Sequence, residues 1–170
     1  PLPRGNRMGA LSITGMGCVA ATDAAEECGV DLPALQTETL KKLGEVIPVW
    51  APVRNPIDTW SAIEQHGSKK ATSHIARCLI EQPDIDALLI TFVLMPESMF
   101  DISEAFADIF RRHPHKPVFA SYYGGTAREI AHIHEGFAAL GVPCYPTPER
   151  AIFAFSRMVE YARFRGIIRK

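Results

Sequence analysis

The sequence predicts an α/β fold of three layers, in which helices cover both faces of a doubly wound, mainly parallel sheet of five strands. Three observations predict it. Short apolar runs alternate along the chain with amphipathic helical patterns, as in chains that form parallel sheets. The most apolar run, residues 87–95, is continuously hydrophobic, which is typical of a strand buried on both faces. A glycine turn at residues 15–17 joins the first apolar run to the first helical pattern.

The N-terminal part of the chain is expected to contain two strands and two helices. The first strand spans residues 8–14, and a helix follows over about residues 18–28, ended by Gly29 as a left-handed residue. Residues 32–35 are predicted to form a short, weak second strand. Thr37 is expected to cap the next helix, because a threonine oxygen can accept from a free N–H of the first turn.

The middle of the chain contains a proline-rich loop and the central strand. The prolines of residues 50–60 are incompatible with regular structure, so this segment is predicted to be a loop. Apolar positions within residues 71–79 recur with helical spacing, and a strand is expected over residues 86–93. The helix after it has apolar residues at positions i, i+4, i+7 and i+8, namely Ile102, Phe106, Ile109 and Phe110.

The last third of the chain supplies two further strands. Residues 116–123 are predicted to form the fourth strand, after which Thr126 and Glu129 match the capping box of a helix. A fifth strand is expected within residues 141–145. A Thr-Pro pair at residues 147–148 then places threonine at the N-cap and proline at the first position of the last helix. Five strands connected in this way predict a flavodoxin-like fold.

The composition indicates one soluble globular domain over residues 1–170, with 47% hydrophobic residues, 22% charged residues and a net charge of -1. This balance argues against a nucleic-acid partner, and no apolar run reaches the roughly 18 residues that span a membrane.

The four cysteines lack the spacing of zinc ligands or of a disulfide framework, so a reduced, cytoplasmic protein is expected. The start of the chain, without Met or a signal-like segment, suggests a piece excised from a larger multidomain protein.

Ligands of such sheets bind beyond the carboxyl ends of the strands. That edge is expected to carry the glycine turn, the end of segment 88–98 and residues 122–126. Free N–H groups and the positive end of a helix dipole favour a phosphate-type anion at the turn. The predicted anion-binding residues are Gly15, Met16, Gly17 and Cys18, and a second glycine turn is formed by Gly124 and Gly125.

Other interpretations of the turn remain open. Residues 15–20 also satisfy the dinucleotide pattern G-x-G-x-x-[GA], but no acidic residue follows at the end of a convincing second strand. The glycines could simply turn the chain, as in many parallel folds. The lysine of a P-loop is missing, which argues against nucleotide hydrolysis there. A helix N-terminus could lower the pKa of the Cys18 thiol, but no partner base is identifiable and a small buried residue is the favoured interpretation.

Two polar residues of the proline-rich loop, Asn55 and Asp58, are further candidates. Asp58 is the best candidate for a polar functional role, and Asn55 can fold onto the backbone in an Asx-turn. Alternatively, both residues only cap the loop and a following helix. His74 falls within a predicted helix, and none of the six histidines forms a convincing catalytic or metal-binding pair. The sequence therefore predicts no catalytic residue and no metal ligand in this chain.

Several segments together resemble one family. The most specific are Asn-Pro-Ile-Asp at residues 55–58 and Gly-Val-Pro-Cys-Tyr-Pro-Thr-Pro-Glu-Arg-Ala at residues 141–151, and the similarity covers nearly the whole chain. The chain resembles the CoA-ligase domain of the NDP-forming acyl-CoA synthetases. These enzymes are the ADP-forming acetate–CoA ligases, which are related to succinyl-CoA synthetase.

The resemblance implies a modular enzyme that interconverts acyl-CoA, ADP and phosphate with an acid, CoA and ATP through a phosphohistidine. Its implied parts are a CoA-binding domain, two flavodoxin-like ligase domains, of which the first carries the histidine, and an ATP-grasp domain that holds Mg. This chain resembles the second ligase domain. It would bind no cofactor and show no turnover alone, and its helix N-terminus would help to stabilise the phosphoryl group. The implied partners are the sister domains, and an oligomer of several copies is compatible with the resemblance.

The sequence departs from the family pattern at two places. The family commonly has a Thr-Asn pair and a longer glycine run, whereas residues 12–17 are Ser-Ile-Thr-Gly-Met-Gly. His74 shares only Ser-His with the family's Ser-His-Thr-Gly motif and is not expected to accept a phosphoryl group. The altered turn favours an alternative: a regulatory or scaffolding domain of a related acyl-CoA synthetase-like or protein acetyltransferase protein.

Overall fold

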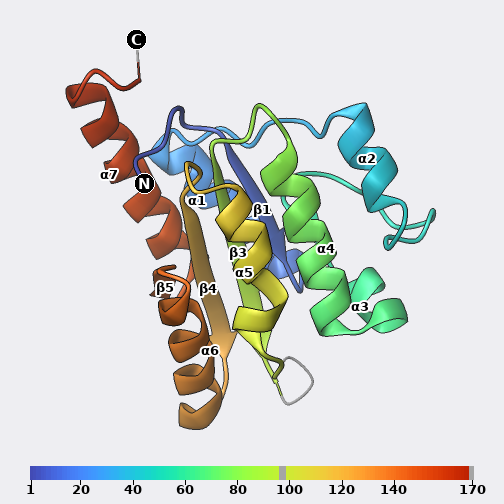
Figure 1. Ribbon diagram of the computed structural model, residues 1–170. Coiled ribbons are helices and arrows are strands. Elements are labelled where there is room, and N and C mark those ends of the chain that lie inside the picture. The colour runs from blue at the N-terminus through green and yellow to red at the C-terminus, as the bar shows by residue number, and fades with distance from the viewer. Residues whose placement is uncertain (96–98, 169–170) are drawn as a thin grey trace.

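The computed structural model describes residues 1–95 and 99–168 (Figure 1). Its sheet has five parallel strands in the order β2-β1-β3-β4-β5, which confirms the predicted doubly wound fold. The strands are β1 (Met8–Ser12), β2 (Ile57–Asp58), β3 (Ala87–Leu94), β4 (Val118–Gly124) and β5 (Cys144–Tyr145).

Helices cover both faces of the sheet. One face packs against α1 and α7, and the other packs against α4, α5 and α6, with α2 and α3 beside α4 (Figure 1). No described helix has the length and hydropathy needed to cross a membrane. The helices are α1 (Gly15–Cys28), α2 (Thr37–Leu43), α3 (Trp60–His66), α4 (Ser68–Glu81), α5 (Ile102–Arg112), α6 (Ala127–Ala139) and α7 (Pro148–Phe164).

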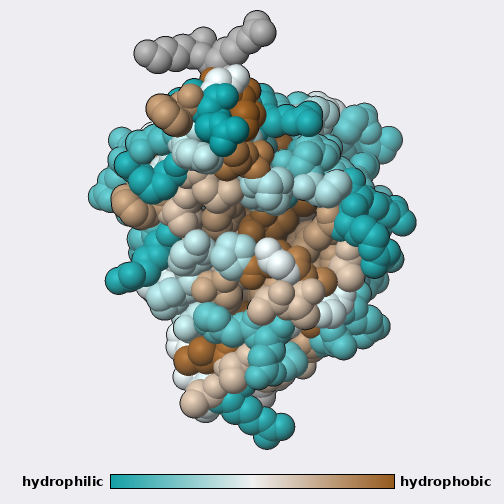
Figure 2. Space-filling view, turned by 60° about the vertical axis from the view of Figure 1, so that its left-hand side comes forward, coloured by the Kyte–Doolittle hydropathy of each residue, from teal (hydrophilic) through white to brown (hydrophobic). Residues whose placement is uncertain are grey.

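The central strand β3 supplies both halves of the core. Its residues alternate, so that Leu88 and Ile90 face α4, α5 and α6, whereas Leu89 faces α1 and α7. On the first side, the buried rings of Phe106 and Phe137 stack with centroids 5.8 Å apart. The second side is built largely from alanines of α1 and the buried rings of α7 and β4. Hydrophobic side chains also gather in a hollow on the side of the molecule shown in Figure 2.

The predicted second strand is wrong. Residues 32–35 are not a strand, and only Asp31 forms an isolated bridge, to Arg7. The second strand is Ile57–Asp58, which lies in the loop that its prolines were expected to keep irregular and pairs with the end of β1. The two-residue strand follows Pro56 directly, so the prolines limit its length without preventing it.

Most predicted helix ends are confirmed. Gly29 ends α1 at φ 64°, Thr126 and Glu129 form a capping box, and Thr147 caps α7 ahead of Pro148. Thr37 is not a cap, because the N-cap position belongs to Gln36 and Thr37 is already helical. The first helix also starts three residues before the predicted Cys18, at Gly15.

Candidate functional site

The first turn of α1 lies at the carboxyl edge of the sheet and is capped by Thr14. The Thr14 hydroxyl accepts from the N–H of Gly17 at 3.2 Å, and its carbonyl accepts from the N–H of Cys18 at 3.2 Å. Among the described residues, the N–H groups of Gly15 and Met16 have no hydrogen-bond acceptor. Of the four predicted anion-binding residues, two therefore offer a free donor and two have already used theirs.

The turn rests directly on the end of β1. The hydroxyl of Ser12 accepts from the N–H of Thr14 at 3.3 Å, and a Cβ added to Gly17 would lie 2.1 Å from that hydroxyl oxygen. Ser12 belongs to a buried row of hydroxyl residues, because it is in register with Thr91, which hydrogen-bonds Ser121 at 2.8 Å. Gly17 is therefore required for the close approach of helix and strand, which fixes where the free N–H groups point.

Asp58 lies beside the same turn. One carboxylate oxygen accepts from the N–H of Trp60 at 3.0 Å, at the start of α3. The other is 3.4 Å from the position that a Cβ on Gly15 would occupy. Asp58 thus contacts the start of the following helix, whose N-cap residue is Thr59, and it also lies beside the candidate site. A functional role for Asp58 stays a prediction. A carboxylate at a helix N-terminus is stabilised by the dipole and opposes the approach of a free anion.

Asn55 is placed away from this edge and does not form the predicted Asx-turn. Its side-chain oxygen accepts from the N–H of Ala10 at 2.9 Å, and its amide donates to the carbonyls of Met8 at 2.9 Å and Pro33 at 3.1 Å. The side chain thereby pairs with β1 much as a neighbouring strand would. Its role is structural, and it joins three segments that are distant in the sequence.

Gly124 and Gly125 end β4 in left-handed conformations, at φ 65° and 91°. A Cβ on Gly125 would lie 2.7 Å from the Cβ of Leu94, so both the backbone angle and the packing require glycine there. These contacts explain the second glycine turn structurally, and its role in binding stays a prediction. Residues 96–98, at the end of a segment predicted for this edge, lie outside the described residues.

Comparison with known proteins finds similarity to one group of ligases. No family model matches the chain. It is 29% identical to acetate–CoA ligase [ADP-forming] II of Archaeoglobus fulgidus over 166 residues, which are 97% of this chain and 24% of the relative. It is 27% identical to the alpha subunit of acetate–CoA ligase [ADP-forming] II of Pyrococcus furiosus, over 98% of this chain and 36% of the relative.

Solved structures agree with these relatives. The dinucleotide forming acetyl-coenzyme A synthetase 1 of Ca. Korarchaeum cryptofilum, in complex with phosphate and ADP, superposes with a TM-score of 0.81 at 26% identity. That match covers 99% of this chain and 35% of the other. The protein PH0766 of Pyrococcus horikoshii has a TM-score of 0.81 at 26% identity, over 96% of this chain and 37% of that protein.

The chain is homologous to part of the ADP-forming acetate–CoA ligases. The resemblance seen in the sequence and the expected fold are thereby confirmed. The chain spans between about a quarter and a third of the length of these relatives. The larger part of each relative therefore lies outside the homologous region.

Two further observations concern residues away from the turn. His74 lies within α4, as predicted, where its Nε2 is 2.9 Å from the carbonyl oxygen of Lys42. Within residues 1–95 and 99–168, no three His, Cys, Asp or Glu side chains are grouped as metal ligands would be. The prediction of no metal ligand is not tested by this arrangement.

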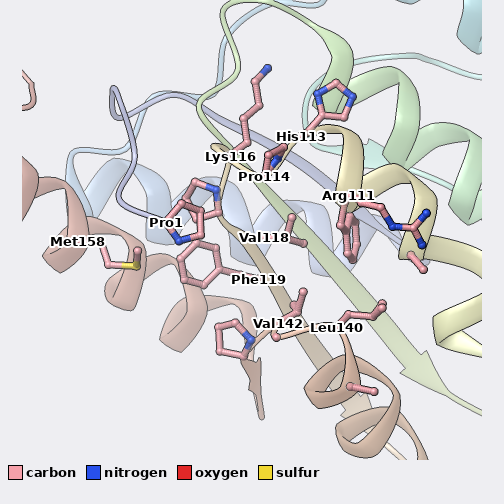
Figure 3. A pocket seen from close by; sticks show the side chains of 16 residues that line it. Pro1, Arg111, His113, Pro114, Lys116, Val118, Phe119, Leu140, Val142 and Met158 are labelled. Atoms are coloured by element: carbon pink, nitrogen blue, oxygen red, sulfur yellow. The ribbon is translucent and has the colours of Figure 1, made fainter.

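A hollow of about 500 Å³ opens near the start of β4, away from the α1 turn (Figure 3). Its walls include Val118, Phe119 and Val142, and it contains none of the predicted site residues. Lys116 lies at its border, but the ammonium group donates to the carbonyls of Ile80 and Gln82, both at 2.8 Å. Burial lowers the pKa of Lys116. Because the Lys116 ammonium group donates to these two carbonyls, it does not point a polar group into the hollow. The wall of the hollow beside Lys116 is therefore apolar.

Cys18 does not have the lowered pKa that a reactive thiol at a helix N-terminus would show. Burial, and then the negative charge of Asp58, raise the pKa of Cys18 from 9.0 to about 12. The small-residue interpretation is therefore favoured over the nucleophile. The Cys18 thiol keeps its proton to a higher pH in the folded state than in the unfolded chain. The contribution of Cys18 to the free energy of unfolding therefore falls as the pH rises from about 9 to about 12.

We expect a variant that keeps Cys18 as its single cysteine to react with a disulfide reagent near pH 8 about 10- to 100-fold more slowly than free cysteine. The smaller thiolate fraction slows the reaction, and the greater nucleophilicity of a thiolate with a raised pKa offsets part of this loss. The measurement is the rate of thiol release with the native protein, and the unfolded variant in urea serves as the control. A native rate equal to the unfolded rate would contradict the raised pKa.

Proposed function

We propose that this chain is the second flavodoxin-like ligase domain of an NDP-forming acyl-CoA synthetase. The parent enzyme would convert an acid, CoA and ATP into acyl-CoA, ADP and phosphate through a phosphohistidine on another domain. The observation that carries the proposal is the pair of free N–H groups, of Gly15 and Met16, at the carboxyl edge of the sheet. The homology to ADP-forming acetate–CoA ligases supports the reaction class.

The role proposed for this chain is electrostatic. Two backbone donors and the positive end of a helix of 14 residues meet at one point, which is an arrangement suited to phosphoryl oxygens. The hydrogen bonds of Ser12 and Thr14 hold these donors in place before a ligand arrives. Donors that are already oriented need no reorganisation when charge develops during phosphoryl transfer.

Asp58 has a complementary part in the proposal. A phosphorylated imidazole has one ring nitrogen bonded to phosphorus, and the other can carry a proton that requires an acceptor. The Asp58 carboxylate, beside Gly15, is a suitable acceptor. The Asp58 carboxylate also repels a free anion. The two N–H donors together with this carboxylate would therefore favour a phosphoryl group that is attached to histidine over inorganic phosphate.

The remaining parts of the reaction belong to sister domains in this proposal. CoA, ATP or ADP, and Mg would bind to the CoA-binding and ATP-grasp domains, and the histidine to the first ligase domain. The isolated chain is therefore expected to have no ligase activity. A second candidate is a regulatory or scaffolding domain, which is favoured by the exposed Met16 side chain at this turn and by the departure of residues 12–17 from the family pattern.

Replacing Gly15 with proline tests the proposal in the enzyme that carries this chain. Proline removes one free N–H, and it suits the first position of a helix after the extended Thr14, at φ -141° and ψ 150°. We expect Gly15→Pro to lower kcat by about 10- to 100-fold, as for the loss of one hydrogen bond to a charged group. The measurements are acyl-CoA synthesis and the level of acid-labile phosphohistidine.

Gly15→Ala is the matched control, because it keeps the N–H and its Cβ makes only an ordinary contact with Asp58. Equal activity of the proline and alanine variants would contradict the proposed role of this turn. A parent protein in which neither the wild type nor the variants form phosphohistidine would instead support the regulatory alternative.

A further inference from the structure

Strand β4 has an unpaired stretch of edge at its start. On the β3 side, the N–H of Leu88 donates to the carbonyl of Pro117 at 3.0 Å. On the β5 side, the N–H of Ala120 donates to the carbonyl of Pro143 at 3.0 Å. Backbone groups of successive residues face opposite neighbours, so Val118, two residues before Ala120, faces the β5 side. Within the described residues, neither the N–H nor the carbonyl of Val118 has a hydrogen-bond partner there.

The connection between α6 and β5 explains why this edge is open. The N–H groups of Gly141 and Val142 donate to carbonyls of the last turn of α6, both at 2.9 Å, and hold the chain against that helix. If the register of β5 continued backwards, the carbonyl of Val118 would need the N–H of residue 143. That residue is Pro143, which has no N–H. Strand β5 therefore cannot extend to cover Val118.

The hollow near the start of β4 lies at this open edge (Figure 3). Its walls come from both layers of the core. Phe110 and Leu140 belong to the layer of α4, α5 and α6, whereas Phe119 and Met158 belong to the layer of α1 and α7. Side chains of a strand alternate between the two faces of a sheet. Successive side chains of an added strand would therefore each meet an apolar wall, so the hollow suits an extended polypeptide.

The border of the hollow is basic. Residues 111–116 are Arg-Arg-His-Pro-His-Lys, which include no acidic residue. Arg111 borders the hollow, and 74% of its side chain is exposed although it also pairs with Asp108 at 2.9 Å. Arg112 is exposed beside it. This excess of positive charge favours a partner with carboxylates next to its apolar side chain.

We propose that the start of β4 and this hollow form a docking site for an extended, acidic segment of another protein chain. One carbonyl of the segment accepts from the N–H of Val118, and one of its N–H groups donates to the carbonyl of Val118. An apolar side chain fills the hollow, and a carboxylate lies beside Arg111. Strand addition of this kind takes affinity from backbone hydrogen bonds and specificity from the side-chain pockets. The inference does not depend on the proposed function.

The experiment titrates the isotope-labelled 170-residue chain with the peptide acetyl-Asp-Val-Leu-Val-Asp-amide and follows the backbone amides by NMR. The sheet and both helical layers lie within the described residues, so the chain contains a complete core of its own. We expect the Val118 amide to shift and its hydrogen exchange to slow by about tenfold or more, because a free N–H becomes paired. The amides of Gly15 and Met16, free at the opposite edge of the sheet, should not change. An unchanged Val118 amide at about 1 mM peptide would overturn the inference.

Methylation of single amide nitrogens in the peptide tests the backbone pairing. Only alternate N–H groups of a strand face the same neighbour. Methylation at one set of alternate positions should therefore weaken binding by about tenfold or more, and methylation at the positions between them should have little effect. Equal effects at every position would contradict the addition of a strand.

Two alanines at the end of α6 provide matched variants. Ala138 and Ala139 are both exposed, but only Ala139 borders the hollow. The larger ring of Ala139→Trp would occupy the hollow and should weaken peptide binding by about tenfold, whereas Ala138→Trp should leave it unchanged. Arg111→Glu should weaken binding of the acidic peptide by about fivefold or more. Equal affinities of the two tryptophan variants would overturn the inference, and circular dichroism would verify that all variants remain folded.

The titration is repeated on the whole protein that carries this chain, because Pro1 also borders the hollow. We expect the peptide to bind the whole protein and the 170-residue chain with affinities that agree within about threefold. Binding to the 170-residue chain alone would overturn the inference, since another part of the same protein would then cover the edge of β4.

Discussion

Replacing Asn55 with alanine is expected to lower the free energy of unfolding by about 2–4 kcal/mol. The substitution removes one acceptor and two donated hydrogen bonds, and it leaves the N–H of Ala10 and the carbonyl of Met8 without partners. Both of these residues are buried, with exposed fractions of 1% and 0%. An unsatisfied buried backbone group costs about 1–3 kcal/mol. The measurement is urea denaturation followed by circular dichroism.

Asn6 provides the matched control for this prediction. Its side chain donates one exposed hydrogen bond, to the carbonyl of Gly29 at 3.1 Å. Asn6→Ala should therefore cost less than about 1 kcal/mol. Asn55→Asp keeps an acceptor for Ala10 but turns a carboxylate toward two carbonyl oxygens, so it should also destabilise the protein. If Asn55→Ala unfolded at the same urea concentration as Asn6→Ala, the side chain would not hold β1 in place.

The same residue shows why the sequence predicted the fold class but misplaced one strand. Periodicity and helix caps are local, and they were sufficient for the long strands and for the capping box of Thr126 and Glu129. The position of β2 depends instead on a side chain that hydrogen-bonds a strand 45 residues earlier. A two-residue strand has no periodicity of its own, so Ile57–Asp58 could not be recognised from the pattern around it.

Part of the candidate site could also be predicted from the sequence. A strand, a glycine turn and a helix were sufficient to place an N-terminus at the carboxyl edge of the sheet. Which N–H groups remain free was not predictable, because it depends on the Thr14 side chain and on where the helix begins. The pKa of the Cys18 thiol was not predictable either, because burial and the negative charge of the nearby Asp58 raise it to about 12.

Gly17→Ala is expected to lower the free energy of unfolding by about 1–3 kcal/mol, the usual cost of forcing extra volume into a packed site. Alanine normally favours a helix over glycine, so the sign of this effect comes from packing alone. The added Cβ would lie 2.1 Å from the Ser12 hydroxyl oxygen and 3.0 Å from the Ser12 Cβ, which are too close for either atom to stay in place. Thermal or urea unfolding would measure the loss.

Gly15→Ala is the control within the same turn, because its Cβ would meet only a carboxylate oxygen at 3.4 Å and should change stability by less than about 1 kcal/mol. A double-mutant cycle with Ser12→Ala then tests the cause. Alone, Ser12→Ala loses the hydrogen bond from the Thr14 N–H and should destabilise the protein. In the Gly17→Ala background it also removes the closest clash, so its cost should shrink or change sign. Strictly additive effects would mean that Gly17 is not held against Ser12, and that the free N–H groups of α1 are not positioned by β1.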